Sequence, residues 1–322
     1  MQLFNKYIFS ALLLVLIASC SGIGPSNEPT DTPTSGDVNV VVDESFQQLF
    51  DTQIYTFQSL YPNAKVHTKY LAESEALNRM MNDSCKVVVM CRDLTTTEKK
   101  QFEAKNLFPI STKIAEDAIA LIVNPENTDS TITLVNVKAI LSGKDSLWDQ
   151  LNKPVISVLK GAPLPQKGKI NVVFDNNGSA NMRYMRDSLL GGKAFGNNTF
   201  AVNSNPEVIE YVSKHKNAIG VLSVNWISDR DDPTVMSFLK KVKVLAVSKT
   251  DTAEAFKPFQ AYIKTKDYAF TRSVYMINRQ TRAGLGMGFV SFVAGDKGQL
   301  MILKAGLVPA IAPVRLVEVR TK

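Results

Sequence analysis

The hydrophobic positions of this chain follow two alternating spacings from Val38 onward. Short β-branched runs, such as residues 38–42 (VNVVV) and 86–90 (KVVVM), are typical of buried strands. Between such runs, apolar residues recur every three or four positions, which gives a helix one buried face. The first of these segments forms a stripe of Phe46, Leu49, Phe50, Ile54, Phe57 and Leu60. Tyr61-Pro62 should end that helix, because a residue before proline disfavours the α conformation.

The repeated alternation of strand and helix predicts an α/β fold with mainly parallel strands. The chain has 322 residues, 45% hydrophobic and 21% charged, which excludes disorder throughout and is typical of a globular protein. Roughly 285 residues of alternating pattern exceed what one core usually holds, so we expect two lobes.

The first twenty residues differ from the rest of the chain. Lys6 precedes an apolar stretch, residues 7–17, which is shorter than the roughly 20 residues of a membrane span. A positive start, an apolar middle and small residues before a cut together indicate an export signal over residues 1–19. Residues 17–20 (IASC) also resemble the bacterial lipobox, which implies that Cys20 becomes the lipidated first residue of the mature protein. An unlipidated secretory signal is the alternative.

Residues 20–37 are expected to form a flexible tether, because they are rich in Gly, Pro, Ser and Thr. The formal net charge of the chain is only +7. No run of five consecutive basic residues occurs, and residues 240–243 (KKVK) are more typical of a solvated strand edge than of a nucleic-acid site. We therefore expect no nucleic-acid partner.

Two cysteines remain after Cys20, and they flank a predicted strand. Cys85 and Cys91 are six steps apart, or roughly 20 Å along an extended chain. A disulfide needs Cα atoms within about 7 Å of each other. Both thiols should therefore be free and buried.

Three strand-to-helix junctions carry small or polar residues: residues 43–45 (DES), 91–95 (CRDLT) and 175–180 (DNNGSA). In open parallel sheets the carboxyl ends of strands line the binding crevice, so these junctions are candidate ligand loops. At the second, Thr95 and Glu98 fit a capping box.

Arg183 stands in the first turn of the helix predicted after the third junction. That end of a helix is already positive, because unpaired N–H groups and peptide dipoles concentrate there. A bound anion would resolve the conflict, since the N–H groups and the guanidinium could share it. The alternative is a solvated ion pair, such as one with Asp187.

Seven motifs follow one another in a recognisable order: DESF, CRDLTTTE, IAEDAIALIVN, NGSANMRY, NAIGVL, YAFTRSVYMI and GDKGQLMILKAGLVPA. This order resembles that of the phosphate-binding proteins that serve Pst-type ABC transporters, over about residues 38–310. The resemblance implies a two-lobed periplasmic binding protein fold, with the ligand in a cleft between two α/β lobes joined by two crossing hinge strands. Lobe 1 would hold residues 38–113 and 249–322, and lobe 2 residues 114–248.

The same resemblance implies a set of ligand-binding residues. By position, these are Ser45, Phe46, Arg92, Asp175, Ser179, Ala180, Asn181 and Arg183. Ser45 could instead be a simple helix cap, and Arg92 could pair locally with Asp93.

The chain departs from the family pattern in three places. Asp175 stands where relatives have an arginine; it could accept the proton of hydrogen phosphate and repel fully ionised sulfate. Cys91 replaces a serine and is a poor hydrogen-bond donor. Residues 71–75 (LAESE) replace a Gly-Ser-Gly turn and bring two carboxylates.

The expected function is capture of an oxyanion, with phosphate preferred over sulfate or molybdate-like ions, and its delivery to the permease of an ABC transporter. The protein would be a monomer, lipid-anchored to a bacterial membrane and facing the periplasm. The alternative is a lipoprotein of the same fold that senses a signal or binds a partner without transport. An enzyme is not expected, because residues 178–180 (GSA) lack the second glycine of a nucleophile elbow. Two histidines cannot form a His-rich zinc site, and we expect no metal or cofactor.

Overall fold

The computed structural model describes residues 31–144, 147–148, 151, 168–229, 231–280 and 282–311. Cys20, the predicted signal and the first part of the predicted tether lie outside these residues. The described strands are Gly36–Asp43 (β1), Ala64–Leu71 (β2), Val87–Met90 (β3), Ile110–Val123 (β4), Thr131–Thr133 (β5), Asn171–Phe174 (β6), Thr199–Ala201 (β7), Ala218–Ser223 (β8), Lys243–Val244 (β9), Ala246–Ser248 (β10), Ala255–Phe256 (β11), Thr271–Asn278 (β12) and Val308–Pro309 (β13).

The described helices are a 3₁₀ turn, Glu44–Phe46 (η1), and Gln47–Leu60 (α2), Glu73–Met81 (α3), Thr96–Glu103 (α4), Leu134–Leu141 (α5), Ala180–Leu190 (α6), Asn205–Lys214 (α7), Asn225–Ser228 (α8), Pro233–Lys241 (α9), Gln260–Lys264 (α10), Leu285–Ala294 (α11) and Asp296–Lys304 (α12). None of the helices in the described ranges is both long and apolar enough to cross a membrane.

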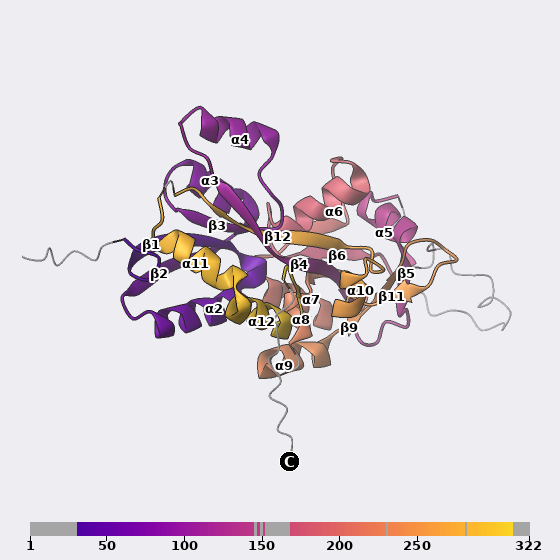
Figure 1. Ribbon diagram of the computed structural model, residues 1–322. Coiled ribbons are helices and arrows are strands. Elements are labelled where there is room, and N and C mark those ends of the chain that lie inside the picture. The colour runs from indigo at the N-terminus through magenta and orange to yellow at the C-terminus, as the bar shows by residue number, and fades with distance from the viewer. Residues whose placement is uncertain are drawn as a thin grey trace, which may run out of the picture. The chain divides into compact units, whose positions relative to one another are not determined.

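A ten-stranded sheet runs through the protein in the order β2-β1-β3-β12-β4-β8-β6-β7 along its main path, with helices packed around it (Figure 1). The outer strands pair in parallel, as the α/β pattern predicts, whereas β12 and β4 at the centre pair antiparallel. The long strand β4 belongs to both halves, because its residues up to Ala118 pair with β12 and those from Ile119 pair with β8. We call the half with β2, β1, β3 and β12 the first lobe, and the half with β8, β6 and β7 the second lobe.

Each lobe has its own hydrophobic core. In the first, α2 and α11 cover β1 and β3, and Phe50, Phe57 and Phe289 meet edge to face. The predicted α2 stripe is confirmed for Phe46, Leu49, Phe50 and Phe57, whereas Leu60 was predicted wrongly, because it is 42% exposed at the last turn. The residue bounds predicted for the two lobes remain a prediction.

Several local predictions are confirmed. Helix α2 ends at Leu60, just before Tyr61-Pro62, and Thr95 and Glu98 form the capping box at the start of α4. Strand β3 lies between Cys85 and Cys91, and both thiols are free and buried. The last residues of the predicted tether are folded, because β1 already begins at Gly36 and Asp31 accepts a hydrogen bond from the Leu285 N–H.

Candidate functional site: a buried polar cluster between the lobes

The carboxyl ends of β1 and β6 meet at the boundary of the two lobes. Strand β1 leads into η1 with Asp43 and Ser45, and β6 leads through Asp175 to Ser179 and α6. Nine polar residues there are at most 5% exposed: Asp43, Ser45, Asp117, Asp175, Ser179, Asn181, Ser223, Asn225 and Arg272. Buried polar groups are costly unless they are paired, so this concentration marks a site.

Ser45 lies at one of the contacts between the lobes. Asn181 Nδ2 of the second lobe lies 3.5 Å from Ser45 Oγ, and Asn225 Nδ2 donates to the Ser45 carbonyl at 3.2 Å. Ser45 does not cap a helix with its side chain; instead, Asp43 accepts a hydrogen bond from the Ser45 N–H at 2.9 Å. The Ser45 hydroxyl is therefore held inside the polar cluster without a capping role.

Asp175 gathers the groups of the second loop. Its carboxylate accepts hydrogen bonds from the Ser179 hydroxyl at 2.7 Å, Asn181 Nδ2 at 2.8 Å and Asn205 Nδ2 at 3.3 Å. Burial raises the pKa of Asp175, and these hydrogen bonds act in the opposite direction. Ser179 also caps α6, where its oxygen accepts from the Met182 N–H at 3.2 Å. Thus Ser179 both starts the helix and lines the site.

Phe46 and Ala180 flank these polar groups and belong to the hydrophobic core of the first lobe. Ala180 is the first residue of α6, which otherwise packs in the second lobe. Its burial among first-lobe side chains shows that the start of α6 reaches across the boundary.

A buried ion pair lies behind the loops. Arg272 on β12 donates from Nε to Asp117 Oδ2 at 2.9 Å, and Asp117 on β4 accepts from the Ser223 hydroxyl at 2.9 Å. Burial raises the pKa of Asp117, and the Arg272 guanidinium opposes that rise. Arg272 Nη1 has no hydrogen-bond partner among the described residues.

The sequence interpretation did not select Asp117 or Arg272, although both lie inside the motifs IAEDAIALIVN and YAFTRSVYMI. The available signal was a charged residue within an otherwise apolar strand. The pattern of a single strand does not indicate which strand lies beside it, so the sequence does not show that the two charges face each other on β12 and β4.

Arg183 meets a carboxylate of the protein itself. Its guanidinium donates to both oxygens of Glu73 on α3, and it lies 3.9 Å from Asp187. Glu73 is 2% exposed and also accepts from the Cys91 N–H at 2.8 Å. The anion at the start of α6 is therefore Glu73 of the other lobe. The predicted role of Arg183 as a ligand contact remains a prediction.

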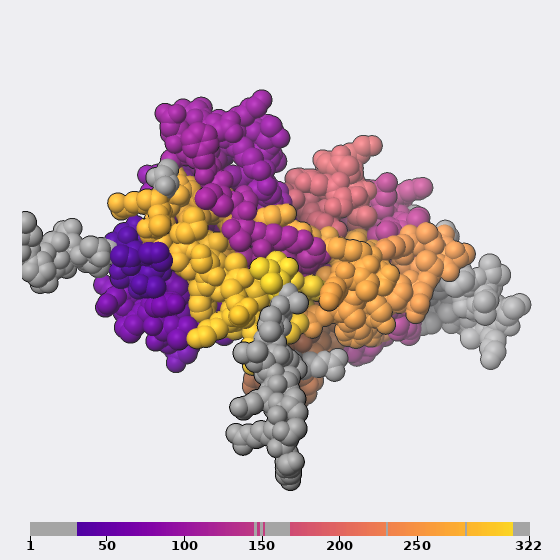
Figure 2. All heavy atoms as spheres, viewed as in Figure 1, coloured from indigo at the N-terminus to yellow at the C-terminus, as the bar shows by residue number. Residues whose placement is uncertain are grey.

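Arg92 lies at the edge of the same contact. It donates to both oxygens of Glu98 at 2.7 and 2.8 Å, to the Asp93 carbonyl at 2.9 Å, and lies 3.6 Å from Glu73 Oε1. Figure 2 shows an indentation of the surface between the part that bears α4 and the part that bears α6. The role predicted for Arg92 also remains a prediction.

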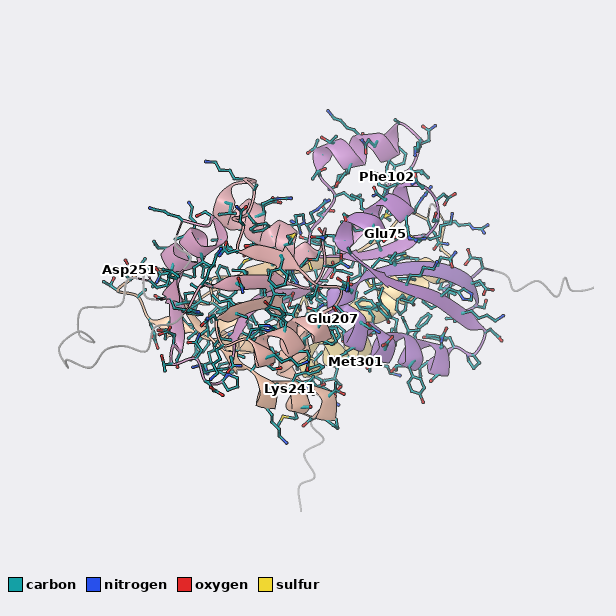
Figure 3. The ribbon with its side chains drawn as sticks, turned by 180° about the vertical axis from the view of Figure 1, so that it is seen from behind. Glu75, Phe102, Glu207, Lys241, Asp251 and Met301 are labelled. Carbon is teal, nitrogen blue, oxygen red and sulfur yellow. The ribbon has the colours of Figure 1, made fainter. Side chains whose placement is uncertain are left out.

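The two carboxylates of residues 71–75 (LAESE), Glu73 and Glu75, lie in different surroundings. Glu73 is buried, whereas Glu75 is an exposed residue of α3, labelled in Figure 3. Glu75 pairs with Arg79 at 2.8 Å. Only one of the two charges therefore acts on the site.

The site is rich in negative charge. Burial, with Glu73 and Asp175 nearby, raises the pKa of Asp43 to about 7. Burial and the carboxylates of Asp175 and Asp43 raise the pKa of Glu44 to about 8. Within the described residues, Asp43 Oδ2 and Asn181 Oδ1 have no hydrogen-bond donor. Such a site favours a guest that brings hydrogen-bond donors or positive charge.

Comparison with known proteins gives one family. The family model described as PBP superfamily domain matches residues 27–297. The phosphate-binding protein PstS of Borreliella burgdorferi is 24% identical over 266 residues, covering 80% of this chain and 84% of the relative. PstS of Staphylococcus aureus strain USA300 is 26% identical over 212 residues, but the match covers only 58% of that relative and 65% of this chain.

Solved structures share the fold. A Clostridium perfringens protein with bound phosphate has a TM-score of 0.68 at 21% identity, covering 86% of this chain and all of that one. An ABC-type phosphate transport receptor from Vibrio cholerae has a TM-score of 0.62 at 17% identity, covering 85% of this chain and all of that one. At these identities the likeness establishes the fold, which is the predicted two-lobed α/β architecture.

Proposed function

This chain belongs to the PBP superfamily, and from that premise we propose that it is an extracytoplasmic solute-binding protein that captures phosphate and delivers it to an ABC transporter. The observation that carries the proposal is the buried cluster of Ser45, Asp175, Ser179 and Asn181, to which both lobes contribute. The relatives named as phosphate-binding proteins support the same ligand.

The cluster offers what a protonated oxyanion requires. The Ser45 hydroxyl and Arg272 Nη1 are donors for anionic oxygens. The Ser179 hydroxyl donates to Asp175 in this structure and would turn to the ligand when Asp175 accepts the proton of the ligand. Asp175 would accept the proton that hydrogen phosphate carries and sulfate lacks. Because the cluster is buried, an ion without that proton, such as sulfate, would leave an Asp175 oxygen unpaired and out of contact with water. The affinity for sulfate should therefore be much lower than that for hydrogen phosphate.

The lobes would have to separate to admit a ligand, since the cluster is buried from both sides. We propose that they open and then close around the ligand by a hinge motion about the central strand β4. Lobe 1 would be residues 38–113 plus 249–322, and lobe 2 would be residues 114–248. The ion pair between Arg183 of α6 and Glu73 of α3 would then stabilise the closed state, because it joins the two lobes.

We further propose that Cys20 carries a lipid anchor and that the protein works as a monomer at a bacterial membrane, facing the periplasm. The lipobox-like IASC sequence supports this. A Cys20→Ala protein should leave the membrane fraction or keep its signal. An unmodified mature N-terminus in the mass spectrum of the wild type would refute the anchor.

A thermal-shift measurement tests the ligand. Protein that has been denatured and refolded, to remove any carried ion, should be stabilised by phosphate. A ligand at a thousand times its dissociation constant adds about 4 kcal/mol, which raises the melting temperature by several degrees. Sulfate should have a smaller effect. No shift with phosphate, sulfate or molybdate would overturn the proposal in favour of a sensor or partner-binding lipoprotein.

A further inference from the structure

Three potential metal ligands gather next to the polar cluster. Asp43, Glu73 and Cys91 each offer one ligand atom, and these atoms lie within 4.8 Å of one another. They come from three elements of the first lobe: the end of β1, the start of α3 and the loop after β3. All three residues are at most 4% exposed. Because one lobe supplies the whole set, its assembly does not depend on closure.

One member of the set is incompletely paired. Asp43 is fully buried, and its Oδ1 accepts the Ser45 N–H, but Oδ2 has no hydrogen-bond partner among the described residues. A buried carboxylate oxygen without a partner is costly, and a second carboxylate, Glu73, lies beside it. A cation bound between the two carboxylates would satisfy the free oxygen and remove their repulsion.

The other two members are held in place. Glu73 Oε2 accepts from the Cys91 N–H at 2.8 Å, and Arg183 donates to both of its oxygens. Hydrogen bonds of this kind orient ligands around a metal. A carboxylate has about four lone-pair positions, so Glu73 can bind a metal without losing these partners.

We propose that Asp43, Glu73 and Cys91 bind a divalent metal ion of the zinc type. One thiolate and two carboxylate oxygens suit Zn²⁺, which binds sulfur at about 2.3 Å and oxygen at about 2.0–2.2 Å. Around such an ion, neighbouring ligand atoms lie roughly 3.3–3.8 Å apart, so side-chain rotation can close the set. Binding displaces the thiol proton of Cys91 into solvent as the Zn–S bond forms.

Three protein ligands leave a fourth position on the ion, as in zinc sites that act on a substrate. This position would face the neighbouring cluster around Ser45. The proposal goes beyond oxyanion capture and does not rest on it, because the three ligands belong to the first lobe alone. The expectation of no metal rested on the presence of only two histidines, whereas these three ligands come together only in the fold.

The test uses the full mature chain without an affinity tag, stripped with EDTA and then dialysed against Zn²⁺ in phosphate-free buffer. Bound metal, measured by elemental analysis, should reach one Zn²⁺ per chain. Cys91→Ser should weaken binding by about tenfold or more, whereas Cys85→Ser, which removes the other buried thiol, should leave it unchanged. Glu73→Gln should also weaken it.

A spectroscopic readout guards against variants that fold poorly. Cd²⁺ added to the wild-type chain should produce the ultraviolet absorption of a sulfur–cadmium bond, and Cys85→Ser should retain that absorption. No bound Zn²⁺ and no Cd²⁺ absorption in folded wild-type protein would overturn the proposal. Equal Zn²⁺ binding by folded Cys91→Ser and wild-type protein would do the same, and would indicate surface binding.

Discussion

Two buried aspartates lie at the carboxyl ends of β1 and β6, and their surroundings differ. Asp175, after β6, accepts hydrogen bonds from the side chains of Ser179, Asn181 and Asn205. Asp43, at the end of β1, accepts one from the Ser45 N–H, and its second oxygen has no partner in the described part of the chain. Both carboxylate oxygens of Asp175 are paired as folded, whereas one oxygen of Asp43 has capacity left for a guest. The fold therefore positions both carboxylates, but only that of Asp175 has its two oxygens hydrogen-bonded by the described residues.

The largest expected effect comes from the ion pair behind both loops. Arg272→Met should destabilise the fold by about 3–5 kcal/mol, because it leaves the buried Asp117 carboxylate without its partner. Urea unfolding at neutral pH measures this difference. The matched control is Arg186→Met, since Arg186 is half-buried, with 43% of its side chain exposed, and its ion pair with Asp187 at 3.2 Å lies at the surface. Equal losses for both variants would contradict the account.

The comparison itself is tested by two amide substitutions. Asp175→Asn should cost about 1–3 kcal/mol in the free energy of unfolding, because its three donors lose a charged acceptor. Asp43→Asn should be neutral or stabilising in metal-free and phosphate-free buffer, because it removes a buried charge that Glu73 and Asp175 repel. If Asp43→Asn lowers the free energy of unfolding more than Asp175→Asn does, then Asp43 and not Asp175 is the carboxylate that the protein groups stabilise.

The Arg183–Glu73 ion pair between the lobes should affect phosphate binding more than the free energy of unfolding. Arg183→Met should weaken phosphate binding roughly tenfold, because charge-assisted hydrogen bonds are worth about 1.5–3 kcal/mol each. Arg186→Met, one turn further along α6, should leave the dissociation constant unchanged. Calorimetric titration of both variants distinguishes a specific role of Arg183 from a general effect of positive charge. A general charge effect would lower the phosphate affinity of both variants equally.

The smallest effect concerns thiol chemistry in the first lobe. Burial raises the pKa of the Cys85 thiol to about 11, so about one thiol in a thousand is ionised at pH 8. Burial also raises the pKa of Cys91. Both thiols should react slowly with a thiol reagent in the folded protein and should react in full after denaturation without reductant. Titrating fewer than two thiols after denaturation, in a chain that begins after residue 20, would indicate a disulfide.

The sequence predicted the alternation of strands and helices and the three junctions, because hydrophobic spacing and loop composition are local properties. It also selected Ser45, Asp175, Ser179 and Asn181, which the structure brings together. It could not predict that Glu73 meets Arg183, or that Asp117 meets Arg272. These pairs join residues 110 and 155 positions apart, and only the tertiary arrangement of strands and helices brings them together. The burial predicted for Leu60 was wrong for a related reason. Periodicity does not show where a neighbouring element stops covering a helix.

The most direct test of the central claim is calorimetric titration of refolded, phosphate-free protein with phosphate, in which the wild type is compared with Ser179→Ala and Ser59→Ala. Ser179 is buried in the cluster, whereas Ser59 is an exposed residue of α2. We expect saturable binding of one phosphate per chain, a loss of about tenfold or more in affinity for Ser179→Ala, and no change for Ser59→Ala. Phosphate binding that is absent from the wild type, or that Ser179→Ala leaves intact, would contradict it.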